Sequence, residues 1–117
     1  MNPETLNELK LVIRNIEEHL VDGNYKNVGS ESGKSNLTAE EIKTTIEKYP
    51  RNGKLTISPL SELDKTEPVE IKNSPIQSWF IDHQLWFDNR PSDLTLQLKA
   101  NLHANKLEVV IEDIHIL

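Results

Sequence analysis

The sequence has no cysteine and no long run of apolar residues. The absence of cysteine excludes disulfide bonds, thiolate metal ligands and a cysteine nucleophile. A transmembrane helix needs about 20 consecutive apolar residues, so we expect no membrane-spanning segment. The first five residues, Met1 to Thr5, are polar and acidic, unlike a signal peptide. We therefore expect a cytoplasmic protein with no membrane partner.

Basic residues are too few to indicate nucleic-acid binding. The 117 residues include 13 Lys and Arg against 19 Asp and Glu, which makes a formal net charge of −6. Residues 1–52 carry −2 of this charge and residues 53–117 carry −4. Phosphate binding needs clustered Lys and Arg, so nucleic acid is not the expected partner. A basic protein fits better, although an acidic balance also commonly serves solubility.

Catalytic and metal-binding motifs are also missing. His19, His103 and His115 show no metal-ligand spacing with one another, and the acids do not form an EF-hand loop. Ser58 and Ser92 lack the context of a nucleophile elbow. We expect no enzymatic activity, no cofactor and no metal ion.

The chain length fits a single domain, residues 1–117. Near the N-terminus, apolar residues recur at spacings of three and four: Leu6, Leu9, Ile13, Ile16 and Leu20. This spacing predicts a helix over about 3–21, which Asn2 caps and Gly23 ends. A capping box of Thr38 and Glu41 predicts a second helix over about 39–48. Residues 23–36, between the helices, are rich in Gly, Ser and Asn and predict a mobile loop.

The rest of the chain, about 54–117, is expected to form the sheet. Alternation of apolar and polar residues predicts a three-stranded antiparallel meander over 78–117. The shared phase places Leu98 opposite both Ile81 and Ile111. The alternation slips after Ile111, which predicts a β-bulge or a strand end with Ile114 and Ile116 on the opposite face.

Shorter strands are expected at 54–58 and 69–71. The fold class is then α+β, with two N-terminal helices packed on an antiparallel sheet of four to five strands that ends in the meander.

Two groups of polar residues leave alternatives open. Glu17, at the end of the first helix, belongs either to a partner-facing patch or, more commonly, to a solvated face. His83 is the polar residue on the inner phase of its strand. Without a bulge, Asp113 would share its face, and a His–Asp pair could serve acid–base chemistry in a pocket. A histidine that is hydrogen-bonded at the margin of the core is the more common arrangement.

The partner-binding candidates are acids near the sheet and two aromatic residues. Trp79 falls on the core phase, whereas Phe80 and Trp86 fall on the other phase, where they lie under a helix or form an exposed anchor. The full set of candidates is Glu62, Asp64, Glu67, Phe80, Asp82, Trp86, Asp88, Glu108 and Glu112.

The C-terminal third resembles a known group of proteins. The residues that carry the resemblance are Asp82, Leu85-Trp86, Arg90, Ser92-Asp93-Leu94-Thr95-Leu96 and Glu112-Asp113-Ile114-His115-Ile116-Leu117. This pattern resembles a family of small bacterial α+β proteins of unknown activity. The size and acidity of the chain also resemble immunity proteins of contact-dependent growth inhibition systems, which bind and neutralise a toxin domain.

These resemblances imply an immunity-type protein. Its expected partner is a cognate toxin domain, such as a basic nuclease, which it would bind through an acidic surface with an aromatic anchor. The alternative is a small ligand-binding or enzymatic domain that uses a pocket near His83. The oligomeric state is left open.

Overall fold

Three long antiparallel strands form the centre of the sheet, as the alternation predicts. The computed structural model describes residues 1–28, 33–49 and 53–117. Its elements are α1 (Pro3–Val21), η1 (Tyr25–Asn27), β1 (Gly33–Ser35), α2 (Ala39–Lys48), β2 (Leu55–Thr56), α3 (Leu60–Asp64), β3 (Val69–Glu70), β4 (Gln77–Phe87), β5 (Arg90–His103) and β6 (Lys106–Ile116). The strands form one mixed sheet of order β1-β6-β5-β4-β2, and β3 also pairs with β4.

The predicted register of the meander is confirmed around Leu98, whereas the pairing of β4 with β5 shifts between Gln84 and Trp86, near the first turn. Leu98 lies opposite Ile81 on one side and Ile111 on the other. Both hairpins turn on two residues with positive φ, Asp88 and Asn89 in the first, and Ala104 and Asn105 in the second. Such turns match the twist of the strands that they join.

Of the two alternatives for the end of β6, a β-bulge or a strand end on the opposite face, the structure shows the β-bulge. Gln97 pairs with Asp113 and Leu98 pairs with Ile111, so Glu112 is the extra residue. The bulge restores the phase of the strand, because Ile114 is buried on the inner face.

Both predicted helices have the expected bounds and caps. Asn2 Oδ1 accepts a hydrogen bond from the Thr5 N–H at the start of α1, and Gly23 follows its end with a φ of 71°. The Thr38–Glu41 capping box begins α2. The buried apolar stripe of α1 consists of Leu9, Ile13, Ile16 and Leu20.

The α+β class is confirmed, with differences in detail. Within the described residues the sheet has six strands, and it is mixed because β1 runs parallel to β6. Of the segment 23–36, predicted to be a mobile loop, residues 25–27 form η1, residues 33–35 form β1 and residues 29–32 lie outside the described part. The strand predicted over 54–58 is confined to Leu55–Thr56, and the five-residue helix α3 was not predicted.

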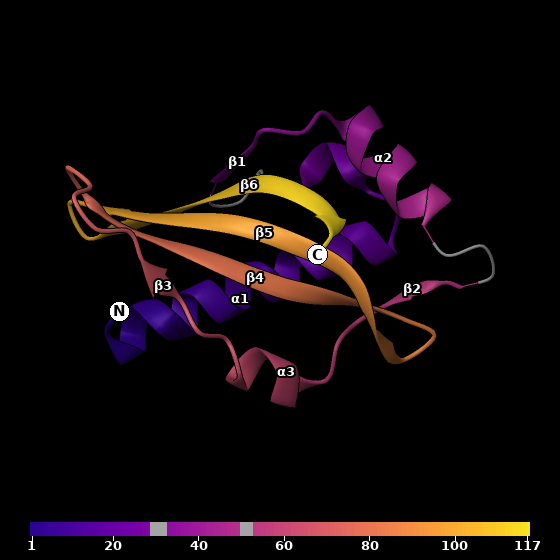
Figure 1. The fold of residues 1–117 in the computed structure, drawn as a ribbon, viewed down its shortest axis with the longest axis horizontal. Coiled ribbons are helices and arrows are strands. Elements are labelled where there is room, and N and C mark those ends of the chain that lie inside the picture. The colour runs from indigo at the N-terminus through magenta and orange to yellow at the C-terminus, as the bar shows by residue number, and fades with distance from the viewer. Residues whose placement is uncertain (29–32, 50–52) are drawn as a thin grey trace.

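The helix α1 covers one face of the sheet, and no described helix lies across the opposite face of β4, β5 and β6 (Figure 1). We call these the inner face and the outer face. The short helix α3 lies beside the β4 edge, between β2 and β3 in the chain (Figure 1). None of the described helices combines the length and the apolar character that a membrane span requires.

Candidate partner-binding surface

The outer face carries the polar phase of each long strand together with two exposed apolar side chains. Phe80 of β4 is 51% exposed, and its neighbour across the strand pair, Val69 of β3, is 64% exposed. On its other side Phe80 pairs with Lys99 of β5. A large aromatic side chain on an uncovered sheet face is the typical anchor of a protein–protein contact.

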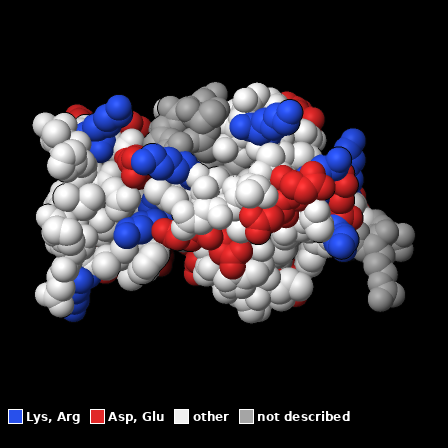
Figure 2. Space-filling model, turned by 90° about the horizontal axis from the view of Figure 1, so that it is seen from above, with Lys and Arg blue, Asp and Glu red and all other residues white. Residues whose placement is uncertain are grey.

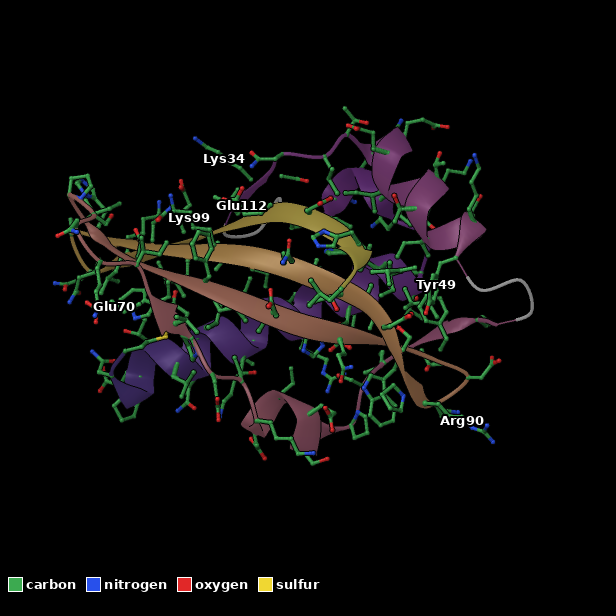
Figure 3. The ribbon with its side chains drawn as sticks, in the orientation of Figure 1. Lys34, Tyr49, Glu70, Arg90, Lys99 and Glu112 are labelled. Carbon is green, nitrogen blue, oxygen red and sulfur yellow. The ribbon has the colours of Figure 1, made fainter. Side chains whose placement is uncertain are left out.

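A hollow of about 470 Å³ lies next to Phe80 on this face. The side chains of Asp82, Gln97, Lys99 and Glu112 line it. Gln97 Nε2 donates a hydrogen bond to Asp82 Oδ1 over 3.2 Å. Figure 3 shows Lys99 and Glu112 on neighbouring strands of the same part of the sheet.

The carboxylate of Glu112 reaches the hollow because of the β-bulge, which inserts this residue between Ile111 and Asp113. Asn36, which directly follows β1, donates a hydrogen bond from Nδ2 to Glu112 Oε2 over 2.6 Å. Both carboxylates of the hollow are thus held by neutral amide groups, and neither has an ion-pair partner among the described residues. They are available to a cation from outside.

Trp86 shares the outer face with Phe80 but does not adjoin it. The two residues are six positions apart on one strand, which corresponds to about 20 Å. Trp86 is half-buried beside Thr56 of β2, and its Nε1 is buried with no hydrogen-bond partner in the described part of the chain. The structure therefore separates the two members of the predicted anchor, and Phe80 with Val69 forms the exposed apolar spot.

The predicted acids are divided between two regions. Asp82 and Glu112 line the hollow, Glu108 lies on β6 opposite Asn101, and Asp88 Oδ1 accepts a hydrogen bond from the Lys54 N–H in the β4–β5 turn.

The other predicted acids belong to α3 and the loop that follows it. Glu62 forms an ion pair with Lys65 at 3.1 Å, and Asp64 forms one with Lys10 at 3.5 Å. Glu67 is exposed after the helix. The structure does not bring these three acids together with the hollow.

Acidic side chains are also grouped on the side of the molecule that carries α2 and β1, which bears Lys and Arg side chains as well (Figure 2). Seen from that side, they form a nearly continuous band, with Lys and Arg on either side of it (Figure 2). The negative potential of such a band extends over roughly one Debye length, about 8–10 Å at physiological salt.

A buried polar cluster lies at the inner face of the sheet, where α1 packs against it. Glu17 is 1% exposed, and its carboxylate accepts hydrogen bonds of 3.0 Å from both the N–H and the Oγ of Ser58. His83 Nε2 lies 3.4 Å from Glu17 Oε2, and Arg14 Nη1 lies 3.3 Å from Glu17 Oε1. Arg14 Nη2 also donates to the Ser58 carbonyl over 2.8 Å.

This cluster determines the ionisation of Glu17. Burial raises the pKa of the carboxyl group, but the interactions with His83 and Ser58 outweigh burial, so the pKa lies below the ordinary value of 4.5. The cluster joins three parts of the chain around one carboxylate: α1, β4 and the segment that follows β2. Because Glu17, Ser58 and His83 are buried, this arrangement holds the elements together.

The expectation of a solvated or partner-facing Glu17 is wrong. The sequence did carry a signal for its burial, because Glu17 is four residues after Ile13 and three before Leu20 and therefore falls on the buried stripe of α1.

The proposed pairing of His83 with Asp113 does not occur. The bulge turns Asp113 to the outer face, where its Oδ2 lies 2.7 Å from His115 Nδ1. His83 is 5% exposed, as expected for a histidine with a partner at the core. Within residues 1–28, 33–49 and 53–117 no three His, Asp or Glu side chains are grouped closely enough to hold a metal ion.

The architecture defines a small α+β domain with a helix on one side of a mixed sheet and an uncovered face on the other. The chain belongs to the family described as a domain of unknown function (DUF7668), whose model matches residues 17–117. No curated protein and no solved structure matches the chain.

Proposed function

We propose that this protein binds a basic protein partner through the outer face of its sheet, as an immunity-type inhibitor that neutralises a cognate toxin domain. The observation that carries the proposal is the exposed pair of Phe80 and Val69 beside the carboxylates of Asp82 and Glu112. The net charge of −6 and the small size of the chain, which resemble those of immunity proteins, support the choice of partner.

The two kinds of side chain would contribute in different ways. Phe80 and Val69 together supply apolar area that a partner would remove from water, which stabilises the complex and slows dissociation. Asp82 and Glu112 would accept charge-assisted hydrogen bonds from Lys or Arg of the partner. Lys99 lowers the negative charge of the hollow, so the apolar contact must supply a large share of the affinity.

Binding kinetics test this proposal. The candidate partner to be tested is the product of whichever gene lies immediately upstream, and its association is measured at low and high salt. Phe80→Ala should accelerate dissociation at least about tenfold, as for a residue at the centre of an interface. Asp82→Asn combined with Glu112→Gln should slow association and weaken its dependence on salt.

Glu18→Gln is the matched control, because Glu18 is an exposed acid on α1 and lies away from the outer face. It should leave both rates unchanged. Charge reversal of Glu62, and separately of Glu67, tests whether the acids of α3 and of the loop after it also attract the partner. If Phe80→Ala and the double variant both bind like the unmodified protein, the partner uses another surface, and if nothing binds, the immunity function is wrong.

The alternative function, a ligand pocket near His83, has less support from the geometry. The imidazole is buried, and the carboxylate of Glu17 occupies the position next to its Nε2. A substrate would have to displace this buried carboxylate from the groups around it, which is strongly unfavourable.

A further inference from the structure

We propose that the chain also associates with a second copy of itself through a groove between α1 and α3. Leu11 of α1 is 67% exposed and Leu60 of α3 is 73% exposed, and both line the same groove of about 330 Å³. Leu63, which is buried, lies between the two helices and also lines it. This surface shares no residue with the hollow on the outer face, and the inference does not depend on the proposed function.

The groove is formed in the free chain and does not need a partner to shape it. Arg14 of α1 donates a hydrogen bond to the Ser58 carbonyl, which fixes the segment that leads into α3. Lys10 Nζ lies 3.5 Å from Asp64 Oδ1 and joins the two helices across the groove. A rigid apolar groove loses little conformational entropy when it binds.

The charges around the groove favour a second copy over a basic protein. Its charged lining residues are two cations, Lys10 and Arg14, and one anion, Asp64. In a chain of net charge −6, this is a place where two copies can meet without strong repulsion. A basic partner would instead meet the two cations.

A two-fold axis would make the surface complementary to itself. In such an isologous contact, if one residue of the first copy contacts a second residue of the other copy, the same two residues also make contact with the copies exchanged. Leu11 and Leu60 of each copy would enter the apolar part of the other groove, and Lys10 of each copy would face Asp64 of the other. The two ion pairs observed within the separate chains, one in each, would be exchanged for two pairs between the chains.

Sedimentation equilibrium over the micromolar to millimolar range tests the proposal on the complete chain. We expect a monomer–dimer equilibrium, and Leu60→Glu and Leu11→Glu should each raise the dimer dissociation constant at least tenfold. Val69→Glu is the matched control, because Val69 is about as exposed but lies on the outer-face side. It should leave the equilibrium unchanged. Circular dichroism verifies that each variant is folded.

Charge exchange tests the two-fold arrangement itself. Lys10→Asp alone and Asp64→Lys alone should each weaken the homodimer, because like charges would then face each other across the axis. A mixture of the two variants should restore association as a heterodimer, since the carboxylate introduced by Lys10→Asp in one chain then faces the ammonium group introduced by Asp64→Lys in the other. An ion pair that matters only within one chain would not be restored by mixing.

Three results would overturn the proposal. The first is a chain that remains monomeric at millimolar concentration. The second is a dimer that Leu60→Glu leaves intact. The third is a mixture of the two charge variants that associates no better than either variant alone.

Discussion

Leu98 shows how a single side chain of the meander supports the whole core. It is 1% exposed, lies at the middle of β5, and pairs with residues of both neighbouring strands. Leu98→Ala should lower the free energy of unfolding by about 2–5 kcal/mol, because it removes buried methyl groups and leaves a cavity. Urea unfolding measures the change. Leu60→Ala, at an exposed position, should change it by less than about 0.5 kcal/mol.

The lowered pKa of Glu17 leads to a prediction about how the stability of the protein depends on pH. Glu17→Gln should lower the free energy of unfolding at neutral pH by about 1.5–3 kcal/mol, since it removes the charge that the surrounding donors stabilise. The pKa of Glu17 is lowered in the folded protein, so its contribution is complete above the ordinary value of 4.5 and is lost as the pH falls below that value.

The stabilities of the two proteins should therefore converge in acid. Urea unfolding at a series of pH values from neutral to about 3 measures both curves. A constant difference between the variant and the unmodified protein across this range would show that the pKa of Glu17 is not lowered by folding. His83→Gln, which changes a neighbour of Glu17 and keeps the carboxylate, is the companion variant and should reduce the acid dependence without abolishing it.

At the scale of elements, we expect the bulge in β6 to matter for the outer face and not for folding. Deletion of Glu112 would turn β6 into a regular strand, with Asp113 still opposite Gln97 and Ile114 still on the inner face. The deletion variant should therefore fold, with a loss of about 1 kcal/mol for the missing hydrogen bond to Asn36. Thermal or urea unfolding measures this loss.

Deletion of Val110 is the matched control, because it also shortens β6 by one residue. It would move Ile111 to the outer face and place Glu112 in the core, which should cost several kcal/mol. Equal losses in the two deletion variants would contradict the assigned register. If the prediction holds, the bulge is not required for folding, and its effect is to place a carboxylate in the outer-face hollow.

The elements that could be predicted from sequence are those with a long local pattern. Each of these elements can be identified from the local sequence: α1 by its apolar stripe, α2 by its capping box, and β4, β5 and β6 by their alternation. The strand β1 has three residues and pairs with β6, more than 70 positions later, so nothing local indicates it. The helix α3 has five residues, too few to show a helical period.

The candidate site was predictable only in part, for the same reason. Alternation placed Phe80, Asp82 and Trp86 on one face. It could not show that Phe80 is exposed and Trp86 half-buried, because this depends on β2 and β3 pairing with opposite ends of β4. The acids of α3 were grouped with the sheet by their charge, whereas the structure places them beside α1.

At the scale of the whole molecule, the two proposed contacts use separate surfaces. The outer-face contact involves β3 to β6, and the self-association contact involves α1 and α3. The elements between them are joined through the buried cluster around Glu17, which fixes α1 to the sheet. Mutations at distant sites without shared partners usually have additive effects. Occupation of one surface should therefore leave the affinity of the other nearly unchanged.

This independence predicts a complex of two copies of the chain with two partner molecules. Light scattering at high protein concentration should give the mass of the 2:2 assembly. Leu60→Glu should reduce it to a 1:1 complex with unchanged affinity for the partner, because the outer face is intact. Phe80→Ala should weaken partner binding and leave the dimer of the free chain as it was. A folded variant that lost both partner binding and self-association would show that the two surfaces are coupled. The partner would then have to bind across the α3 edge.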